Sequence, residues 1–286
     1  MREHKFRRLL KMECCKAMRN PFFLAVLAAG MLFAVLAALY NIGAYRTWMD
    51  NVRITGGNPM QQAASLYNHW IGGEAQSLGY TLFYTLLPLL AVFPYGWSYC
   101  TERRAGYTRM VVIRGGKRQY FLAKYIAAFL SGGAAVLLPL LINLAATACF
   151  VPAVKPFVSY MLYYGMAHGS MWSGIYYEHP LVFVLLYLLL DFLFAGLFAV
   201  TALGLSVYVR NQAAAVLLPY LGVLCLHYAR TLLYYRVYIE ISPLHFLHAS
   251  CVENSVSWVV VLAEGVILFL FSAGSIWKAG AVDEVW

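Results

Sequence analysis

The stretch 181–208, LVFVLLYLLLDFLFAGLFAVTALGLSVY, decides the fold class of this chain. It is 28 residues long and contains a single charged residue, Asp191. A helix needs about 20 apolar residues to cross a hydrocarbon core of about 30 Å, and within that core its backbone must satisfy its own hydrogen bonds. The stretch therefore predicts a membrane-spanning helix.

The rest of the chain repeats this pattern. Of its 286 residues, 62% are hydrophobic and 12% are charged, against about 45–50% and about 25% in soluble domains. Six apolar runs follow one another, at 21–44, 80–99, 120–151, 181–208, 213–228 and 257–277. We predict an all-α polytopic membrane protein with six transmembrane helices in one domain, 1–286. The fifth run is the least regular, because Pro219 either kinks it or lets it continue through Tyr235.

The positive charges predict the orientation. The side that carries both termini and the segment between the second and third runs holds 16 of the 21 Lys and Arg residues, and the other side holds 5. Such residues stay on the cytoplasmic side, so both termini should be cytoplasmic. Residues 1–20 mix apolar and basic residues before Pro21, which fits an interfacial elbow helix or an ordinary basic flank.

Several functional classes lack support in the sequence. The formal net charge of +9 flanks apolar runs, where it matches anionic lipid, so we expect a lipid bilayer as partner and no nucleic acid. The six cysteines have no metal-ligand spacing, and only Cys149 and Cys251 are placed to pair. The sequence 115–117, GGK, lacks the remaining residues of a phosphate-binding loop. We therefore predict no enzyme, no metal and no cofactor on this chain.

Two acids interrupt the apolar runs, Asp191 in the fourth and Glu264 in the sixth. A charge at the bilayer centre is costly, so both should face protein or water. They are either a substrate-linked or proton-linked site, or hydrogen-bonded links between helices. Small residues form a narrow face on the fourth run, where we expect close packing within the molecule. They are Ala195, Gly196, Ala199, Ala202 and Gly204.

The segment after the second run, 100–124, is short and strongly basic. Its candidate contact residues are Glu102, Arg103, Arg104, Gly106, Thr108, Arg109, Lys117 and Arg118. Here the chain resembles the permease subunits of type-2, exporter-class ABC transporters, including those found with bacterial peptide-antibiotic resistance systems. Their corresponding loop has an acid, a glycine with a nearby threonine, an apolar stretch, a basic pair and a lysine. Glu102, Gly106, Thr108, 110–113, Lys117 with Arg118, and Lys124 match that order, although Gly115 and Gly116 replace the usual proline.

The resemblance implies a function. Segment 100–120 would be a cytoplasmic coupling loop seated on a separate ABC ATPase subunit, which binds ATP and Mg. A second permease chain, identical or different, would complete an exporter in a bacterial plasma membrane. Two alternatives stay open: a stand-alone sensor or immunity protein that binds through the aromatic outer loop at 152–180, with Tyr163, Tyr164 and Trp172, and a proton-coupled secondary carrier that uses Asp191 or Glu264.

Overall fold

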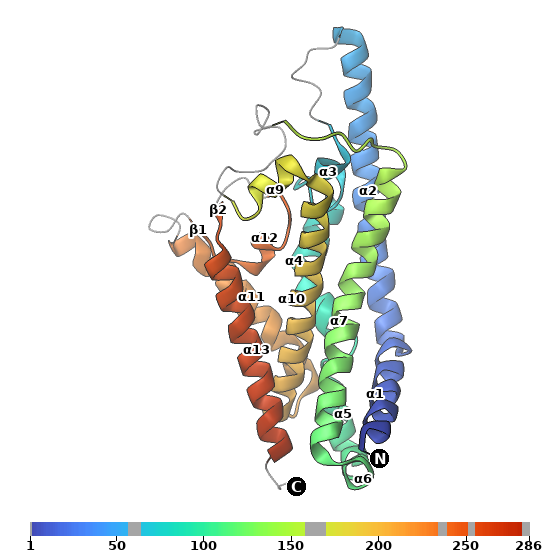
Figure 1. The fold of residues 1–286 in the computed structure, drawn as a ribbon, viewed down its shortest axis with the longest axis vertical. Helices are drawn as coiled ribbons and strands as arrows, with labels where there is room; N and C mark the ends of the chain where they lie inside the picture. The colour runs from blue at the N-terminus through green and yellow to red at the C-terminus, as the bar shows by residue number, and fades with distance from the viewer. Residues whose placement is uncertain (1, 57–63, 158–169, 234–238, 251–254, 282–286) are drawn as a thin grey trace.

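The computed structural model describes residues 2–56, 64–157, 170–233, 239–250 and 255–281, and most of them are helical (Figure 1). The long helices are α1 (Arg2–Met18), α2 (Pro21–Thr55), α4 (Leu78–Val92), α7 (Lys117–Ala148), α10 (Pro180–Tyr208), α11 (Gln212–Leu233) and α13 (Trp258–Ala281). The short ones are α3 (Leu66–His69), α5 (Ser98–Arg104), α6 (Tyr107–Gly115), α9 (Ser173–Glu178) and α12 (Pro243–Phe246). Strands β1 (Ile239–Glu240) and β2 (Ser255–Val256) form one parallel pair.

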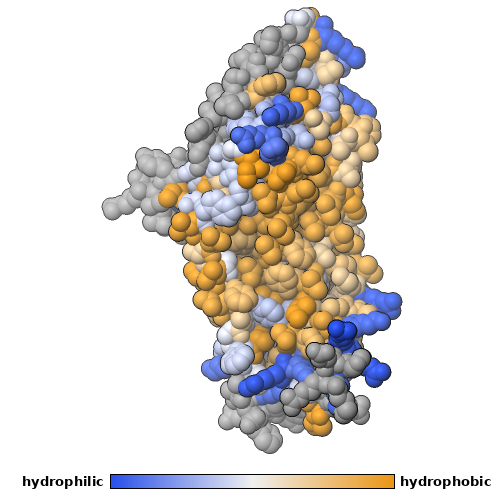
Figure 2. All heavy atoms as spheres, viewed as in Figure 1, coloured by the Kyte–Doolittle hydropathy of each residue, from blue (hydrophilic) through white to orange (hydrophobic). Residues whose placement is uncertain are grey.

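Five helices, α2, α7, α10, α11 and α13, are long and apolar enough to cross a membrane. They align along the long axis of the molecule, and Figure 2 shows an apolar band between two polar ends. These features confirm the prediction of an all-α membrane protein. In the fifth predicted span, α11 continues past Pro219 to Leu233 without a break, and Tyr235 lies outside the described residues.

The second predicted span differs from its expectation. Its helix, α4, ends at Val92 after 15 residues, and a turn at 93–97 follows before α5 begins. Pro94 has no N–H to continue the helical ladder, and Gly96 bonds back to Val92 in the turn. Alone, α4 is shorter than the roughly 17 to 25 residues that a crossing needs.

The segments expected to be loops also contain helix. The segment between the first two apolar runs begins as helix, because α2 continues to Thr55 and ends where Gly56 adopts a left-handed conformation. Tyr45 stacks on Trp48 along this extension, with ring centroids 5.8 Å apart. In the aromatic segment 152–180, residues 173–178 form α9, whereas Tyr163 and Tyr164 lie outside the described residues. So does Cys251, and Cys149 is a free thiol.

The two ends of the molecule have different contents. Figure 1 places α1, α5, α6 and the C-terminal end of α13 together at the lower end, and α3, α9 and the strand pair toward the upper end. The segments that carry most of the basic residues therefore meet at one end. The chain enters α2 from α1 at Asn20, whose side chain caps α2 and also donates a hydrogen bond to the carbonyl of Pro94.

Helix α10 is the packing centre. The small face predicted on it meets other helices of the same chain: a Cβ on Gly132 of α7 would stand 2.5 Å from that of Ala199, and one on Gly196 would touch the ring of Phe129. Gly204 faces Ser275 of α13. The close approach is therefore intramolecular, as expected, and it brings α7 and α10 together along the axis that connects the two polar ends.

Candidate functional site

Helices α5 and α6 form a short helical pair at the lower end, between α4 and α7. Gly106 joins them with φ +69°, and Gly116 joins α6 to α7 with φ +85°. Both values lie in the left-handed region, which glycine enters without the penalty that a Cβ imposes. The two glycines thus set the directions of the two turns.

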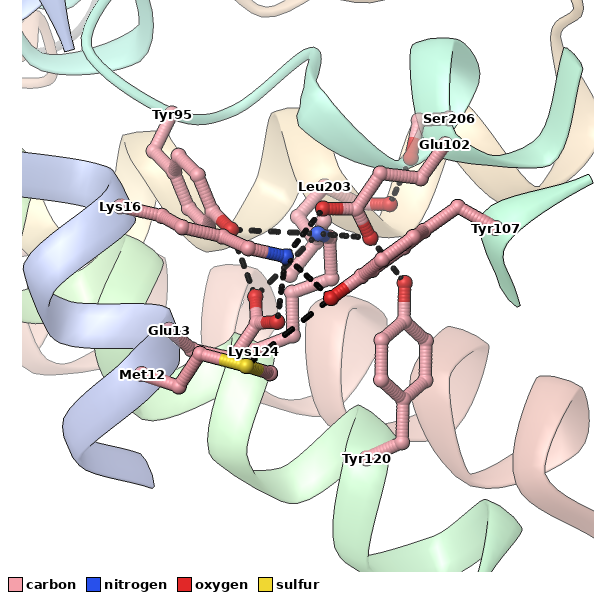
Figure 3. A network of polar contacts seen from close by, with 10 residues as sticks. All are labelled: Met12, Glu13, Lys16, Tyr95, Glu102, Tyr107, Tyr120, Lys124, Leu203 and Ser206. Atoms are coloured by element: carbon pink, nitrogen blue, oxygen red, sulfur yellow. Dashed lines mark hydrogen bonds and ion pairs between the residues drawn. The ribbon is translucent and has the colours of Figure 1, made fainter. Parts of the chain in front are cut away.

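Glu102 of α5 points into the molecule (Figure 3). Its carboxylate lies 2.8 Å from the ammonium of Lys124 and 3.4 Å from that of Lys16, and it accepts a hydrogen bond of 2.5 Å from the hydroxyl of Tyr120. Only 15% of the side chain is exposed. Glu102 is therefore paired with residues of its own chain, and these contacts connect α5 to α7 and α1.

Lys124 has a second acidic partner, Glu13 of α1. Both side chains are completely buried, with 3.4 Å between the ammonium and the carboxylate. Tyr95, in the turn before α5, donates a hydrogen bond of 2.5 Å to Glu13. Glu13, Lys16, Glu102 and Lys124, which we call the ion cluster, contain two charges of each sign, so their formal charges cancel.

The electrostatics of the cluster favour its ionised form. Burial acts to raise the pKa of Glu102, but the charge of Lys124 and the hydrogen bonds from Lys124 and Tyr120 outweigh burial and hold that pKa below its ordinary value. Burial acts to lower the pKa of Lys16. The hydrogen bond of 2.8 Å to Tyr107 and the two nearby carboxylates outweigh burial, so the pKa of Lys16 is raised above its ordinary value. Both ions are therefore charged near neutral pH.

The two arginines after Glu102 point the other way, toward α10 and the segment after it. Arg103 donates to the carbonyl of Val207 at 3.3 Å, and Arg104 donates to that of Arg210 at 2.7 Å. A cation there satisfies carbonyls that the end of the helix leaves free and complements its dipole. Thr101 also accepts a hydrogen bond of 2.7 Å from Gln212 of α11. Thus α5 is joined to four helices: α1, α7, α10 and α11.

The remaining predicted contact residues are dispersed. Thr108, in the first turn of α6, is buried. Lys117 is the first residue of α7. The next residue, Arg118, is exposed, and its guanidinium lies 5.5 Å from the centroid of the Trp277 ring. Arg109 belongs to α6, but its side chain lies outside the described part of the structure. The structure therefore gathers Glu102 with new partners and does not gather the basic residues into one site.

Helix α6 has two unlike faces. Val111 and Val112 pack against a cluster of buried apolar side chains that includes Tyr120 and Phe121. Met110 and Ile113, in contrast, are 58% and 85% exposed. These two exposed residues are three apart, so they lie on one side of the helix. They form an apolar surface at the end of the molecule that also carries its basic segments.

The two acids in the apolar runs are also apart. Asp191 of α10 is fully buried and Glu264 of α13 is partly exposed, and among the described residues no hydrogen bond or ion pair joins them. The hydroxyl of Tyr84, on α4, is the polar group that acts on the Asp191 carboxylate. Neither group has a hydrogen bond of ordinary geometry within the described structure.

A group of aromatic and histidine rings lies beside Tyr84, and sequence reasoning missed it. The ring of His248 is 5.7 Å from Tyr84 and 5.2 Å from Tyr80, and His245 and His227 follow at steps of 5.8 and 5.1 Å. The spacing of His245 and His248, three residues apart near a short helix, was the available signal. Nothing in the sequence connects them to residue 84.

The ion cluster was missed for the same reason. Its members come from residues 13 to 124, and the two acids lie among many basic residues. The one available signal was that Glu13 is the single acid between Glu3 and Asp50 in a strongly basic segment.

No protein-family model, curated protein or solved structure matches the chain.

Proposed function

We propose that the chain is the transmembrane permease subunit of an ATP-driven exporter, in which a separate ABC ATPase binds ATP and Mg. The observation that carries the proposal is the construction of α5. It is fixed to α1 and α7 by the ion cluster, to α10 by Arg103, to the segment after α10 by Arg104 and to α11 by Gln212. A force applied to this helix reaches four others through polar contacts.

Helix α6 would supply the contact with the ATPase. Its apolar pair, Met110 and Ile113, is exposed beside basic residues, a combination that suits an apolar groove with an acidic rim. Glu102 is not part of this contact, because its partners are intramolecular. The residues left to face the ATPase are therefore the exposed side of α6 and the neighbouring basic side chains.

The same proposal fixes the orientation. The end with α1, α5, α6 and the end of α13 would be cytoplasmic, because it carries most of the basic residues. Helix α4 and the turn at 93–97 would together form most of the second of six crossings, and α5 would begin the cytoplasmic segment. A second permease chain would complete the transport path, in the plasma membrane of a bacterium.

The test is affinity purification of the tagged full chain from its native membrane, with identification of the proteins that accompany it. We expect an ATPase with a phosphate-binding loop in near-equal amount. Ile113→Asp should reduce its recovery about tenfold or more, because a charge would replace an apolar contact at the centre of the interface.

The matched control is Ile54→Asp, which alters an equally exposed isoleucine, 81% against 85%, near the end of α2. It should leave recovery unchanged. Repeated isolation of a functional chain without any ATPase would contradict the proposal.

One observation favours a second candidate, a proton-coupled secondary carrier: Asp191 is buried without a cationic partner in the described structure. That carrier would work without an ATPase and would lose activity in Asp191→Asn. No comparable observation favours the sensor, because Trp172 packs against Tyr187 and Trp258.

A further inference from the structure

Within the described structure, Asp191 is a buried acid without an ion-pair partner. It has no exposed surface, and neither carboxylate oxygen has a hydrogen-bond partner within the described structure. The contrast with Glu13, equally buried, is sharp, since that carboxylate has Lys124, Lys16 and Tyr95 around it. Buried polar groups are normally satisfied, so Asp191 needs a separate explanation.

The elements around α10 supply no cation near Asp191. The part of α7 from 126 to 148 has no ionisable residue, and α13 supplies Glu264. Helix α4 supplies Tyr84 and Tyr80, with Tyr187 of α10 beside them. Among the described residues, the other ionisable groups of the neighbouring segments include Glu74, His179 and His248 in loops, Tyr67 and His69 of α3, Tyr176, Tyr177 and Glu178 of α9, His227, Tyr228 and Arg230 of α11, Glu240 of β1 and His245 of α12. Arg230 is occupied by Glu240 at 2.8 Å.

An ionised carboxylate in this setting would have neither water nor a counter-ion. A buried acid without a partner neutralises by taking up a proton. A bound metal ion is a poor substitute, because hard cations need several oxygen ligands. Among the described residues, Tyr84 supplies the one hydroxyl that acts on this carboxylate, and no group of three potential metal ligands occurs there.

A series of ionisable rings connects this acid with the partly exposed surface. Tyr84 neighbours His248, His248 neighbours His245, and His245 stacks on His227, with ring centroids 5.7, 5.8 and 5.1 Å apart. His248 is buried, whereas His245 and His227 are partly exposed. Burial increases along the series toward Asp191, so the series leads from the partly exposed histidines to the buried acid.

We propose that Asp191 is a proton-binding site, which holds a proton in this conformation and exchanges it with the upper end through Tyr84, His248, His245 and His227. On release, the Asp191 proton passes to the Tyr84 oxygen while the Tyr84 proton passes to a ring nitrogen of His248. The proton on His248 then passes through His245 and His227 to solvent. The charge left behind is the Asp191 carboxylate.

The properties of His248 fit a relay. Burial, with His245 next to it, lowers the pKa of His248 to about 3, so the ring is neutral at physiological pH. A neutral imidazole has one donor and one acceptor nitrogen, and can accept a proton on one side while giving one up on the other. The inference concerns the chain itself and does not depend on the proposed ATPase.

The test is infrared spectroscopy of the purified full chain in lipid at neutral pH. A protonated carboxyl has a C=O stretch apart from the carboxylate and amide bands, and that band shifts when the proton is exchanged for deuterium. We expect Asp191→Asn to remove a component of the band, and the matched variant Glu264→Gln to leave that component in place. An unchanged band in Asp191→Asn would overturn the proposal.

Two further variants complete the design. If Asp191→Asn does not fold, Tyr84→Phe decides, because loss of the facing hydroxyl should shift the component, and an unshifted band would overturn the site. For the route, His248→Phe should slow deuterium exchange of the component about tenfold or more, since it interrupts the relay, whereas His69→Phe should not. Equal exchange rates in both variants would overturn the route.

Discussion

Lys124 is a fully buried cation between two carboxylates, one from the N-terminal helix and one from the basic segment. Its position explains why a charged residue is tolerated inside the molecule. Attraction to Glu13 and Glu102 offsets the loss of hydration, and the hydroxyls of Tyr95 and Tyr120 satisfy remaining oxygens. Such a cluster stabilises one arrangement of helices, because each ion is costly to leave unpaired.

Lys124→Met should therefore destabilise the protein strongly. It keeps most of the length of the side chain but leaves Glu13 and Glu102 with Lys16 as their remaining common cation. Removing one partner of a buried ion pair costs about 3 to 5 kcal/mol. The measurement is the free energy or midpoint of unfolding in detergent.

Two variants give this experiment its controls. Lys11→Met, at an exposed position of α1, should change stability by less than about 0.5 kcal/mol. Combining Glu13→Gln with Lys124→Met should cost less than the sum of the separate changes, because an uncompensated charge is removed with its partner. Additive losses would show that the two residues do not interact.

At the scale of elements, the direction of α6 depends on the backbone of Gly106. A Cβ at this position would touch nothing, so the requirement for glycine is purely conformational. Gly106→Ala should destabilise by about 1 to 2 kcal/mol, the cost of a left-handed conformation for a residue with a side chain. Thermal unfolding measures this cost.

Gly43→Ala is the matched control. Gly43 lies within α2, and a Cβ there also touches nothing, but the backbone is helical. Alanine should stabilise this position by about 0.5 to 1 kcal/mol. A Gly106→Ala protein at least as stable as Gly43→Ala would contradict the structural reading of the turn.

The sequence predicts the long helices well and the ends of elements less well. Apolar runs such as 181–208 are decided by local composition, so α10 begins within one residue of its prediction and ends where expected. The early end of α4 depends on a turn around Pro94 and Gly96, and the extension of α2 depends on where one glycine turns left-handed. Such boundaries follow from single residues that a hydropathy pattern averages away.

The candidate site was predictable only in part. The basic segment stands out by charge, and the small face of α10 stands out by residue size. The partners of Glu102 and the Tyr84 hydroxyl that acts on Asp191 do not, because each is 18 or more residues away along the chain. Helix packing decides which charged residues come together, and the spacing of residues along the chain does not indicate these pairs.

At the scale of the whole molecule, two buried polar centres lie at different levels of one helix bundle. The ion cluster connects α1, α5 and α7 at the lower end, and Asp191 with Tyr84 connects α10 and α4 further along the axis. Helices α7 and α10, packed closely through Gly132 and Ala199, link the two. A movement of α5 would therefore change the surroundings of Asp191, provided that α4 and α10 move with it.

The most direct test of the proposed function is the rate of ATP hydrolysis by the ATPase that we propose as partner, measured alone and with the chain in lipid nanodiscs. We predict that the wild-type chain changes the rate severalfold, and that Arg103→Ala with Arg104→Ala removes most of the effect while the ATPase stays bound. Those variants break the contacts of α5 with α10 and with the segment after it and leave α6 intact. Arg46→Ala with Arg53→Ala, on the part of α2 away from this end, should behave as wild type. An ATPase rate that does not respond to the chain, or responds equally with both arginine pairs, would contradict the coupling role of α5.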